Sequence, residues 1–271
     1  MTSPLDVFPI LVSFLRKIHR QRHLIFSFVR RDLRARYVGS LIGIFWSVLH
    51  PLVLLASYTF VFAGVFKVPV ASGHGSFALF LFCGILPWLF FQETLIRSAG
   101  ILLENSQILK KTLFPAEILP ITVVCSTLVH HGIGFGVLLG ALLWKGLLTW
   151  TVVLVPLYLL LLALLALGLA WIVSALQLYL RDTAQVLSVL LIFWFWFTPI
   201  FYERSMAPKW IVPWLGLNPL TYVVESYRML LLEGRVPPWQ SFWPLLAAAL
   251  AAFVIGGLLF RSLKREFVDV L

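Results

Sequence analysis

Charged residues are scarce in this sequence. Only 12% of its 271 residues are Asp, Glu, Lys or Arg, whereas soluble domains carry about 25%. Hydrophobic residues make up 61% of the chain, and its mean hydropathy is +0.98. This composition excludes an ordinary water-soluble protein, because too few polar side chains are present to cover its surface. We therefore expect a protein embedded in a membrane.

Groups that carry metal, redox or nucleotide chemistry are also few. The two cysteines, Cys83 and Cys125, lie far apart in apolar stretches, so we interpret them as small buried residues. No GxxxxGK[ST] loop is present, and we do not expect this chain to bind ATP by that route. His130 and His131 are adjacent and point about 100° apart on a helix, which favours packing or hydrogen bonding over a metal or acid–base pair. We expect no catalytic site and no metal site.

Long apolar stretches dominate what is present, and six of them predict six transmembrane helices. They cover residues 41–66, 77–101, 116–144, 150–178, 186–202 and 242–260. Each is long enough, or nearly so, to cross a hydrocarbon core of about 30 Å as a helix. We predict one all-α integral membrane domain over 1–271. It has a cytoplasmic or interfacial segment at 1–40, six spans within 41–260, and a cytoplasmic tail at 261–271.

Two spans have distinctive small or aliphatic residues. The fourth is rich in Leu and Ala between Leu159 and Leu169, which predicts a simple lipid-facing span. In the third, Gly132, Gly136 and Gly140 recur every four residues and share one helix face. Such glycines allow close approach to a neighbouring helix.

The distribution of basic residues predicts the orientation. With the N-terminus inside, 14 Lys and Arg lie on the cytoplasmic side and six on the opposite side. This bias places both termini in the cytoplasm. Residues 1–40 lack an apolar run that ends at a small-residue cleavage site, so we expect no signal peptide. The net charge of +10 is explained by anionic lipid headgroups rather than nucleic acid.

Two segments differ from plain spans and loops. Residues 8–20 and 24–36 place apolar side chains on one helical face, which is typical of helices that lie in the membrane interface. The basic end of the second segment is a candidate contact for anionic headgroups, through Arg30, Arg31, Arg34, Arg36 and Tyr37. Residues 204–240 are rich in Trp and Pro, which predicts short re-entrant gate helices between spans five and six.

Two ionisable residues fall inside the second span. Glu93 and Arg97 are four residues apart on one helix face, so we expect them to pair. Ionisable groups within a membrane usually face the protein interior or a water-filled path. The pair is therefore interpreted either as a structural ion pair or as part of the lining or gate of a polar pathway.

Aromatic residues make up 15% of the chain, and five follow one another at 193–197. A belt at the membrane interface explains many of them. Five in succession surround a helix, however, so some must face protein or a channel. Aromatic faces stack on sugar C–H surfaces, which suits a lining for a glycan. The candidate channel aromatics are Trp46, Trp88, Phe193, Trp194, Trp196, Phe197 and Tyr202.

Four stretches of the chain resemble the ABC-2 type permeases that export polysaccharides. They are RDLRARYVGSLIGIFW at 31–46 with Pro51, NSQILKKTLFPAEILP at 105–120, YLRD at 179–182 followed by TPIFY at 198–202, and LNPLT at 217–221 with Glu225 and Arg228. The likeness follows the order of nearly the whole chain and the number of spans.

The resemblance implies a half-channel of a bacterial inner-membrane exporter, not an enzyme. Such permeases dimerise and dock two copies of a separate ATPase, which binds ATP and Mg²⁺, and this chain then needs no cofactor. Their substrates are O-antigen, capsule or teichoic-acid chains on a lipid carrier. The implied ATPase contacts are the interfacial helix and the loop after the second span, with Glu104, Asn105, Ile108, Lys110, Lys111, Phe114 and Pro115. The implied outer gate contains Asn218, Pro219, Glu225 and Arg228.

Two alternatives remain open at this point. An ABC-2 drug or lipid exporter would have a smaller, less aromatic cavity than this sequence indicates. An integral-membrane enzyme that acts on a lipid carrier would need acid–base or nucleophilic groups clustered near one interface, and no such cluster is recognisable in the sequence.

Overall fold

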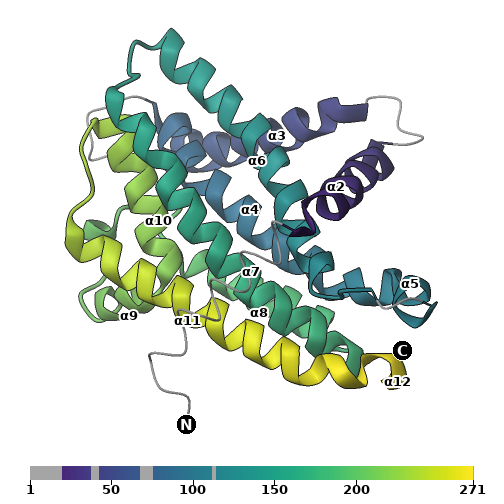
Figure 1. Cartoon of the computed structure of the whole chain (residues 1–271). Coiled ribbons are helices and arrows are strands. Elements are labelled where there is room, and N and C mark those ends of the chain that lie inside the picture. Colours follow the sequence, from purple (N-terminus) through teal and green to yellow (C-terminus); the bar gives the residue numbers. More distant parts are fainter. Residues whose placement is uncertain (1–19, 38–42, 68–75, 112–113, 271) are drawn as a thin grey trace.

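The computed structural model describes residues 20–37, 43–67, 76–111 and 114–270, and every regular element in these ranges is helical (Figure 1). The long helices are α3 (Trp46–Thr59, continued by η3, Phe60–Val65), α4 (Phe77–Glu104), α6 (Ile118–Trp144), α7 (Val155–Tyr179, preceded by η4, Trp150–Leu154) and α11 (Trp239–Leu263). The shorter helices are α2 (Arg22–Tyr37), α5 (Ser106–Lys111), α8 (Thr183–Trp196), α9 (Val212–Leu217), α10 (Pro219–Arg228) and α12 (Phe267–Val270). Single turns complete the chain at η2 (Gly43–Phe45), η5 (Arg204–Met206), η6 (Met229–Glu233) and η7 (Lys264–Glu266). The prediction of an all-α membrane domain is confirmed.

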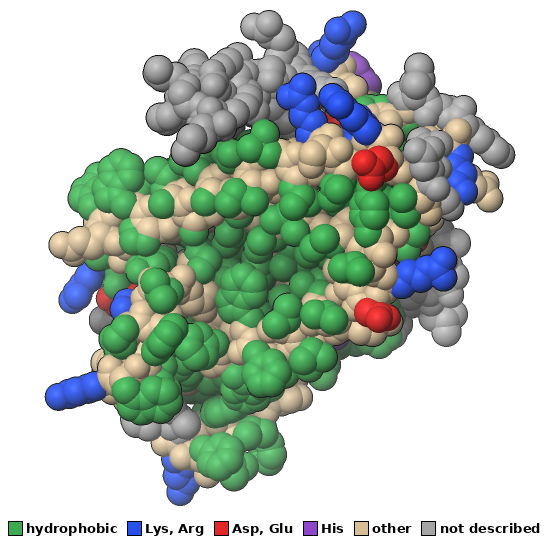
Figure 2. Space-filling view, turned by 90° about the horizontal axis from the view of Figure 1, so that it is seen from below, with side chains coloured by type: hydrophobic (Ala, Val, Ile, Leu, Met, Phe, Trp, Pro, Cys, Tyr) green, Lys and Arg blue, Asp and Glu red, His purple; other side chains and the backbone are tan. Residues whose placement is uncertain are grey.

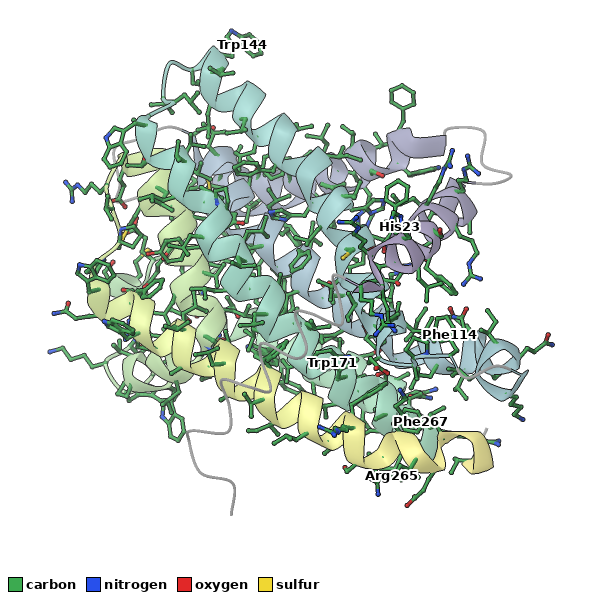
Figure 3. All side chains as sticks on the ribbon, in the orientation of Figure 1. His23, Phe114, Trp144, Trp171, Arg265 and Phe267 are labelled. Carbon is green, nitrogen blue, oxygen red and sulfur yellow. The ribbon has the colours of Figure 1, made fainter. Side chains whose placement is uncertain are left out.

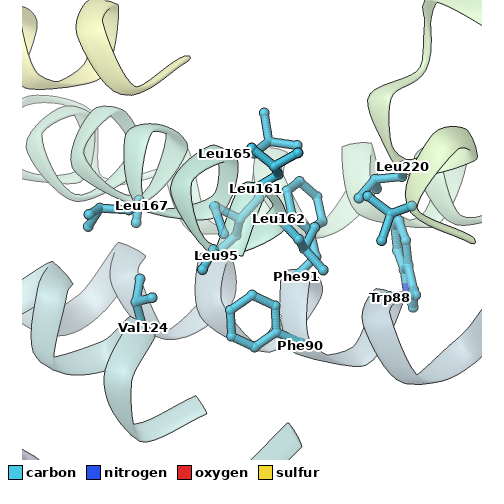
Figure 4. Packing of buried hydrophobic residues seen from close by; sticks show 14 of the residues in the cluster. Trp88, Phe90, Phe91, Leu95, Val124, Leu161, Leu162, Leu165, Leu167 and Leu220 are labelled. Carbon is cyan, nitrogen blue, oxygen red and sulfur yellow. The ribbon is translucent and has the colours of Figure 1, made fainter. Parts of the chain in front are cut away.

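Helix α4 lies at the centre of the packing. It contacts α7, α6 and α10, and α7 in turn packs along α11. Figure 4 shows Phe91 and Leu95 of α4 beside Leu161 and Leu162 of α7, and Trp88 of α4 beside Leu220 of α10. Since lipid tails are as apolar as these side chains, close van der Waals contact rather than exclusion of water favours the association.

The interpretation of the fourth span as a simple lipid-facing helix is wrong. Most of α7 between Leu161 and Ala170 is buried, because α4 and α11 cover it on two sides. The contact with α11 depends on glycine. A Cβ on Gly168 would lie 2.3 Å from the Ala252 carbonyl carbon, and a Cβ on Gly256 would lie 2.1 Å from the Gly168 carbonyl oxygen. The backbones therefore touch where neither residue has a side chain.

The glycine face predicted for the third span does not pack against a described neighbour. No described atom comes within 4 Å of a Cβ built on Gly132, Gly136 or Gly140, so these glycines do not bring a neighbour of the same chain close. Gly134, between them, does so. A Cβ at that position would lie 2.7 Å from Leu86 of α4. The packed face of α6 is rotated from the one that the repeat indicated.

Five helical segments in the described ranges are long and apolar enough to span a membrane: Trp46–Val65, Phe77–Glu104, Ile118–Trp144, Trp150–Tyr179 and Trp239–Glu266. Helix α8 has 14 residues, or about 21 Å at about 1.5 Å per residue, which is short of the hydrocarbon thickness. The sixth span therefore stays a prediction. Short helices do follow α8, namely α9 and α10, and their re-entrant position stays a prediction as well.

Different short helices lie at the two ends of the helical bundle (Figure 1). Figure 1 shows α5 and α12 toward one end and α9 toward the other, and Figure 2 shows a largely apolar face with Lys and Arg at its margins. Trp144 ends α6, is 93% exposed and points away from the bundle (Figure 3). This pattern suits a body whose sides contact lipid and whose ends contact headgroups and water.

Two smaller predictions are also resolved. The helix expected at 24–36 is present as α2, whereas residues 8–19 of the preceding amphipathic segment lie outside the described residues. Cys83 and Cys125 are free thiols that pack in or against the apolar core, which confirms their interpretation as core residues.

The α7–α11 contact yields a stability prediction with a neighbouring control. Gly256→Ala should destabilise the protein by about 1–3 kcal/mol, because its methyl group overlaps the Gly168 carbonyl and must push the helices apart. Gly257→Ala should be neutral or slightly stabilising, since its Cβ would meet only the Trp171 ring at 3.6 Å and alanine favours a helix. Thermal unfolding of the two purified variants in detergent measures the difference. Equal melting temperatures would contradict the close approach.

Candidate functional site

Helix α2 is held along the second half of α4 by polar contacts. The Arg31 guanidinium donates to the Asn105 side-chain oxygen at 2.8 Å, and Arg97 and Asp32 form an ion pair at 2.5 Å. A third contact joins Arg36 to Glu93. Numbers rise along α2 as they fall along α4, so the two segments run antiparallel.

The predicted pair between Glu93 and Arg97 is wrong. Both residues lie on the face of α4 that α2 covers, and α2 presents a charge of opposite sign to each of them. Glu93 therefore pairs with Arg36 and Arg97 pairs with Asp32. The Arg36 side chain is 16% exposed and the Glu93 side chain 32% exposed. The ion pairs thus join two helices instead of two turns of one helix.

A histidine from α6 completes this network. Nε2 of His130 lies 2.9 Å from Nη1 of Arg36 and 3.1 Å from Oγ of Ser47, and its Nδ1 lies 3.6 Å from Glu93. Its neighbour His131 is buried and lies 3.2 Å from the Tyr227 hydroxyl on α10. The interpretation of both histidines as hydrogen-bonding residues is confirmed.

A cavity of about 670 Å³ lies beside the network, between α2, α3, α4 and α6. Its polar and aromatic walls come from Arg36, Trp46, Ser47, His50, Gln92, Glu93, Arg97, Thr127, His130 and His131. Its apolar walls come from Pro51, Leu86, Leu89, Phe90, Ile96 and Gly134. The volume is in the range of ligand pockets. Walls of both kinds suit a molecule with a polar head and an apolar part.

The basic residues of α2 do not form a single headgroup cluster. Arg30 and Arg34 are exposed, whereas Arg36 points into the cavity. The Arg31 guanidinium stacks 4.3 Å above the Phe28 ring and holds Asn105. The last residue of α2 is Tyr37. Among the predicted headgroup contacts, Arg30 and Arg34 are thus the exposed arginines that are not directed to Asn105 or the cavity.

The predicted channel residues are separated into three places. Trp46, Glu93 and Arg97 line the cavity, and Trp88 is buried in the core, with its ring 5.2 Å from Phe195. The remaining ones lie around α8 and α10. Phe193, Trp196 and Phe197 are exposed, Tyr202 and Glu225 are half-buried, and Arg228 is buried.

Helix α10 begins with a polar cap that also binds the end of α8. The Asn218 side-chain oxygen accepts a hydrogen bond from the backbone N–H of Leu220, which caps the helix ahead of Pro219. The same oxygen accepts from the Trp194 indole at 2.9 Å, and the amide donates to Thr198 at 3.0 Å. Asparagine at this position is a favoured N-cap, and here it also joins two helices.

The predicted coupling segment is partly engaged within the chain. Glu104 and Lys110 are exposed and Ile108 is half-buried, whereas Asn105 is buried and holds Arg31. The Phe114 ring lies 5.2 Å from that of Phe28 on α2, so the ring expected to anchor a partner already has one here. The chain then enters α6 through Pro115, whose carbonyl accepts from Ile118. Lys111 ends α5.

Several residues of the site were missed from the sequence. Asp32 is the acidic residue of α2, four positions before Arg36, and this spacing was the available signal. Ser47, His50 and Gln92 gave none, because isolated polar residues in apolar stretches do not indicate which helix they face.

The pairing across α2 and α4 predicts which charge exchange is tolerated. Glu93→Gln leaves Arg36 without its carboxylate and should cost about 2–3 kcal/mol, less than for a fully buried pair. Exchange of the true partners, Arg36→Glu with Glu93→Arg, should restore part of that loss. The matched exchange within α4, Glu93→Arg with Arg97→Glu, should lower stability further, because it places like charges beside Arg36 and Asp32. Melting temperatures in detergent measure the stability of each variant. Equal recovery by both exchanges would contradict the ion pairs between α2 and α4.

The chain is similar in sequence to known transport proteins. The sequence pattern of the ABC-2 type transporter family matches residues 23–232, which extend from α2 to η6. An O-antigen export system permease protein of Myxococcus xanthus is 29% identical over 265 residues, with 96% of this chain and 99% of that protein covered. A protein with the same description from Klebsiella pneumoniae is 30% identical over 254 residues and covers 92% of this chain and 95% of its own. A polysialic acid transport protein of Escherichia coli is 23% identical over 247 residues, with 86% and 90% covered. The chain belongs to the ABC-2 type transporter family.

Proposed function

We propose that this chain is the permease subunit of an ATP-driven exporter that moves a lipid-linked polysaccharide across a bacterial inner membrane. The observation that carries this proposal is the pair of relatives named for O-antigen export and polysialic acid transport, which align with 96% and 86% of the chain. The substrate class is thus an O-antigen-like, capsule or teichoic-acid chain.

The geometry of the site supports the same substrate class. A lipid-linked glycan has an anionic head, an apolar tail and a long hydroxyl-rich chain. The cavity offers arginine and histidine on one side and aliphatic side chains on the other, which suits the carrier end. Exposed rings on α8, among them Phe193 and Trp196, suit contact with sugar faces.

The energy for transport comes, in this proposal, from a separate ATPase that binds ATP and Mg²⁺. Two copies of that ATPase act on a homodimer of this chain. Helix α3 with η3 has almost no buried surface in a single copy, and a second copy would cover part of it. The exposed residues of the coupling segment, Glu104 and Lys110, are the ones we expect to face the ATPase, with Phe114 supporting them through α2.

Orientation and coupling can be tested with two cysteines. Gln107 on α5 and Ser205 on η5 are exposed, and the basic-residue bias places them on opposite sides. Gln107→Cys should react with an impermeant maleimide only from the cytoplasmic side, and added ATPase should protect it. Ser205→Cys should react only from outside and be unaffected by the ATPase. Reaction of both cysteines from one side would contradict the topology, and unprotected Gln107→Cys in an assembled complex would exclude α5 from the contact.

Export itself is tested by reconstitution. Vesicles that contain this chain and its ATPase partner should move a radiolabelled lipid-linked glycan into the lumen when ATP is present. An ATPase with its phosphate-loop lysine replaced is the control and should give no export. Transport of a phospholipid or a small amphiphilic drug without glycan export would instead indicate an ABC-2 drug or lipid exporter. Chemical modification of the carrier would indicate an enzyme.

A further inference from the structure

Arg228 ends α10 as a buried cation, with 6% of the residue exposed. Its guanidinium binds backbone carbonyls rather than a carboxylate. It donates to Ile200 at 2.6 Å, to Pro199 at 2.8 Å and to Tyr202 at 3.4 Å. These three oxygens belong to the turn that follows α8, so one side chain satisfies three backbone carbonyls of that turn.

The same guanidinium also holds the beginning of α4. Nε of Arg228 donates to the Phe80 carbonyl at 3.4 Å, and Cζ of Arg228 lies 3.5 Å from the centre of the Phe80 ring. Room for it comes from Gly84, where a Cβ would lie 2.9 Å from Nη2 of Arg228. The site is therefore shaped for a guanidinium by α4 and by the turn together.

The other end of α10 holds the same turn. The Asn218 amide donates to the Phe197 carbonyl at 3.3 Å and to the Thr198 hydroxyl at 3.0 Å. Residues 197–202 thus lie between an N-cap side chain and a C-terminal arginine of one short helix. Helix α10 therefore holds the turn through hydrogen bonds from both of its ends.

We propose that Arg228 is a positioning residue that fixes the 197–202 turn, and with it the aromatic end of α8, against α4. Five N–H donors in a planar fork satisfy several carbonyls at once, and hydrogen bonds from a charged donor are stronger than neutral ones. A lysine has a single ammonium on a flexible stem and cannot reach these oxygens together. The turn is therefore held by arginine specifically.

A consequence for transport rests on the proposed function. Phe193, Trp196 and Phe197 are exposed on the end of α8 that leads into this turn. If they contact the passing glycan, the guanidinium sets the position of that aromatic surface without touching the substrate. Arg228 would then influence the width of the passage from within the protein.

The test uses two buried reporter cysteines in a chain with Cys83→Ala and Cys125→Ala. Ile200→Cys reports on the turn, and Ala249→Cys reports on α11, since both positions are fully buried. Arg228→Gln should raise the rate of maleimide modification at Ile200→Cys about ten-fold or more, as expected when local opening loses charged hydrogen bonds. The rate at Ala249→Cys should not change. Arg228→Lys should not restore protection.

Two further variants make the outcome decisive. Gly84→Ala keeps the arginine but places a methyl group against Nη2, so it should also expose Ile200→Cys selectively. Arg204→Gln removes a nearby arginine whose hydrogen bond goes to the Val212 carbonyl at 3.4 Å and not to the 197–202 turn as the structure describes it, and should change neither rate. Protection of Ile200→Cys in both Arg228→Gln and Gly84→Ala would overturn the proposal. So would a rise at both reporters in Arg228→Gln, which would assign Arg228 to overall folding. Labelling of purified protein requires neither ATPase nor glycan, so failure of export leaves this result intact.

Discussion

Charges inside a membrane domain must find partners within the protein, and this constraint acts at both ends of α4. Toward its C-terminal end, Glu93 and Arg97 are matched by charges on α2. Toward its N-terminal end, Phe80 and Gly84 accommodate Arg228. Between these ends most residues of the helix are buried, and Leu86, Leu89 and Phe90 line the cavity. The positions of α2 and α10 therefore follow from what α4 requires.

A series of contacts leads from α2 through the cavity to α10. Helix α2 is attached to α4 through ion pairs, and the cavity lies in the angle that they form with α3 and α6. His131 lines that cavity and contacts Tyr227, the residue before Arg228. A movement of α2 relative to α4 would thus change the shape of the cavity. The contact between His131 and Tyr227 would connect that change to α10.

Much of the architecture was predictable from composition and pattern. Long apolar runs indicated all five long spans, because a helix that crosses hydrocarbon needs about 20 apolar residues whatever its neighbours are. The amphipathic period of 24–36 indicated α2, and the Trp- and Pro-rich composition of 204–240 indicated short helices before α11. The sequence-based predictions were wrong about which face of a helix packs against its neighbours. Gly132, Gly136 and Gly140 share a face that meets no described atom, while Gly134, Gly168 and Gly256 make the close contacts.

The sequence by itself determined the class of protein, the places of the five long helices and the family, because these depend on composition, on the length of apolar runs and on the order of motifs. Only the tertiary structure decided which charges meet. Spacing placed Glu93 and Arg97 one turn apart on α4. Which partner each of them binds depends on the charges that a neighbouring helix presents to that face, and α2 presents Asp32 and Arg36. The same holds for Arg228, whose acceptors are carbonyls of a turn 26 to 29 residues away. Every residue has a carbonyl, so no side-chain pattern distinguishes the ones that an arginine will bind.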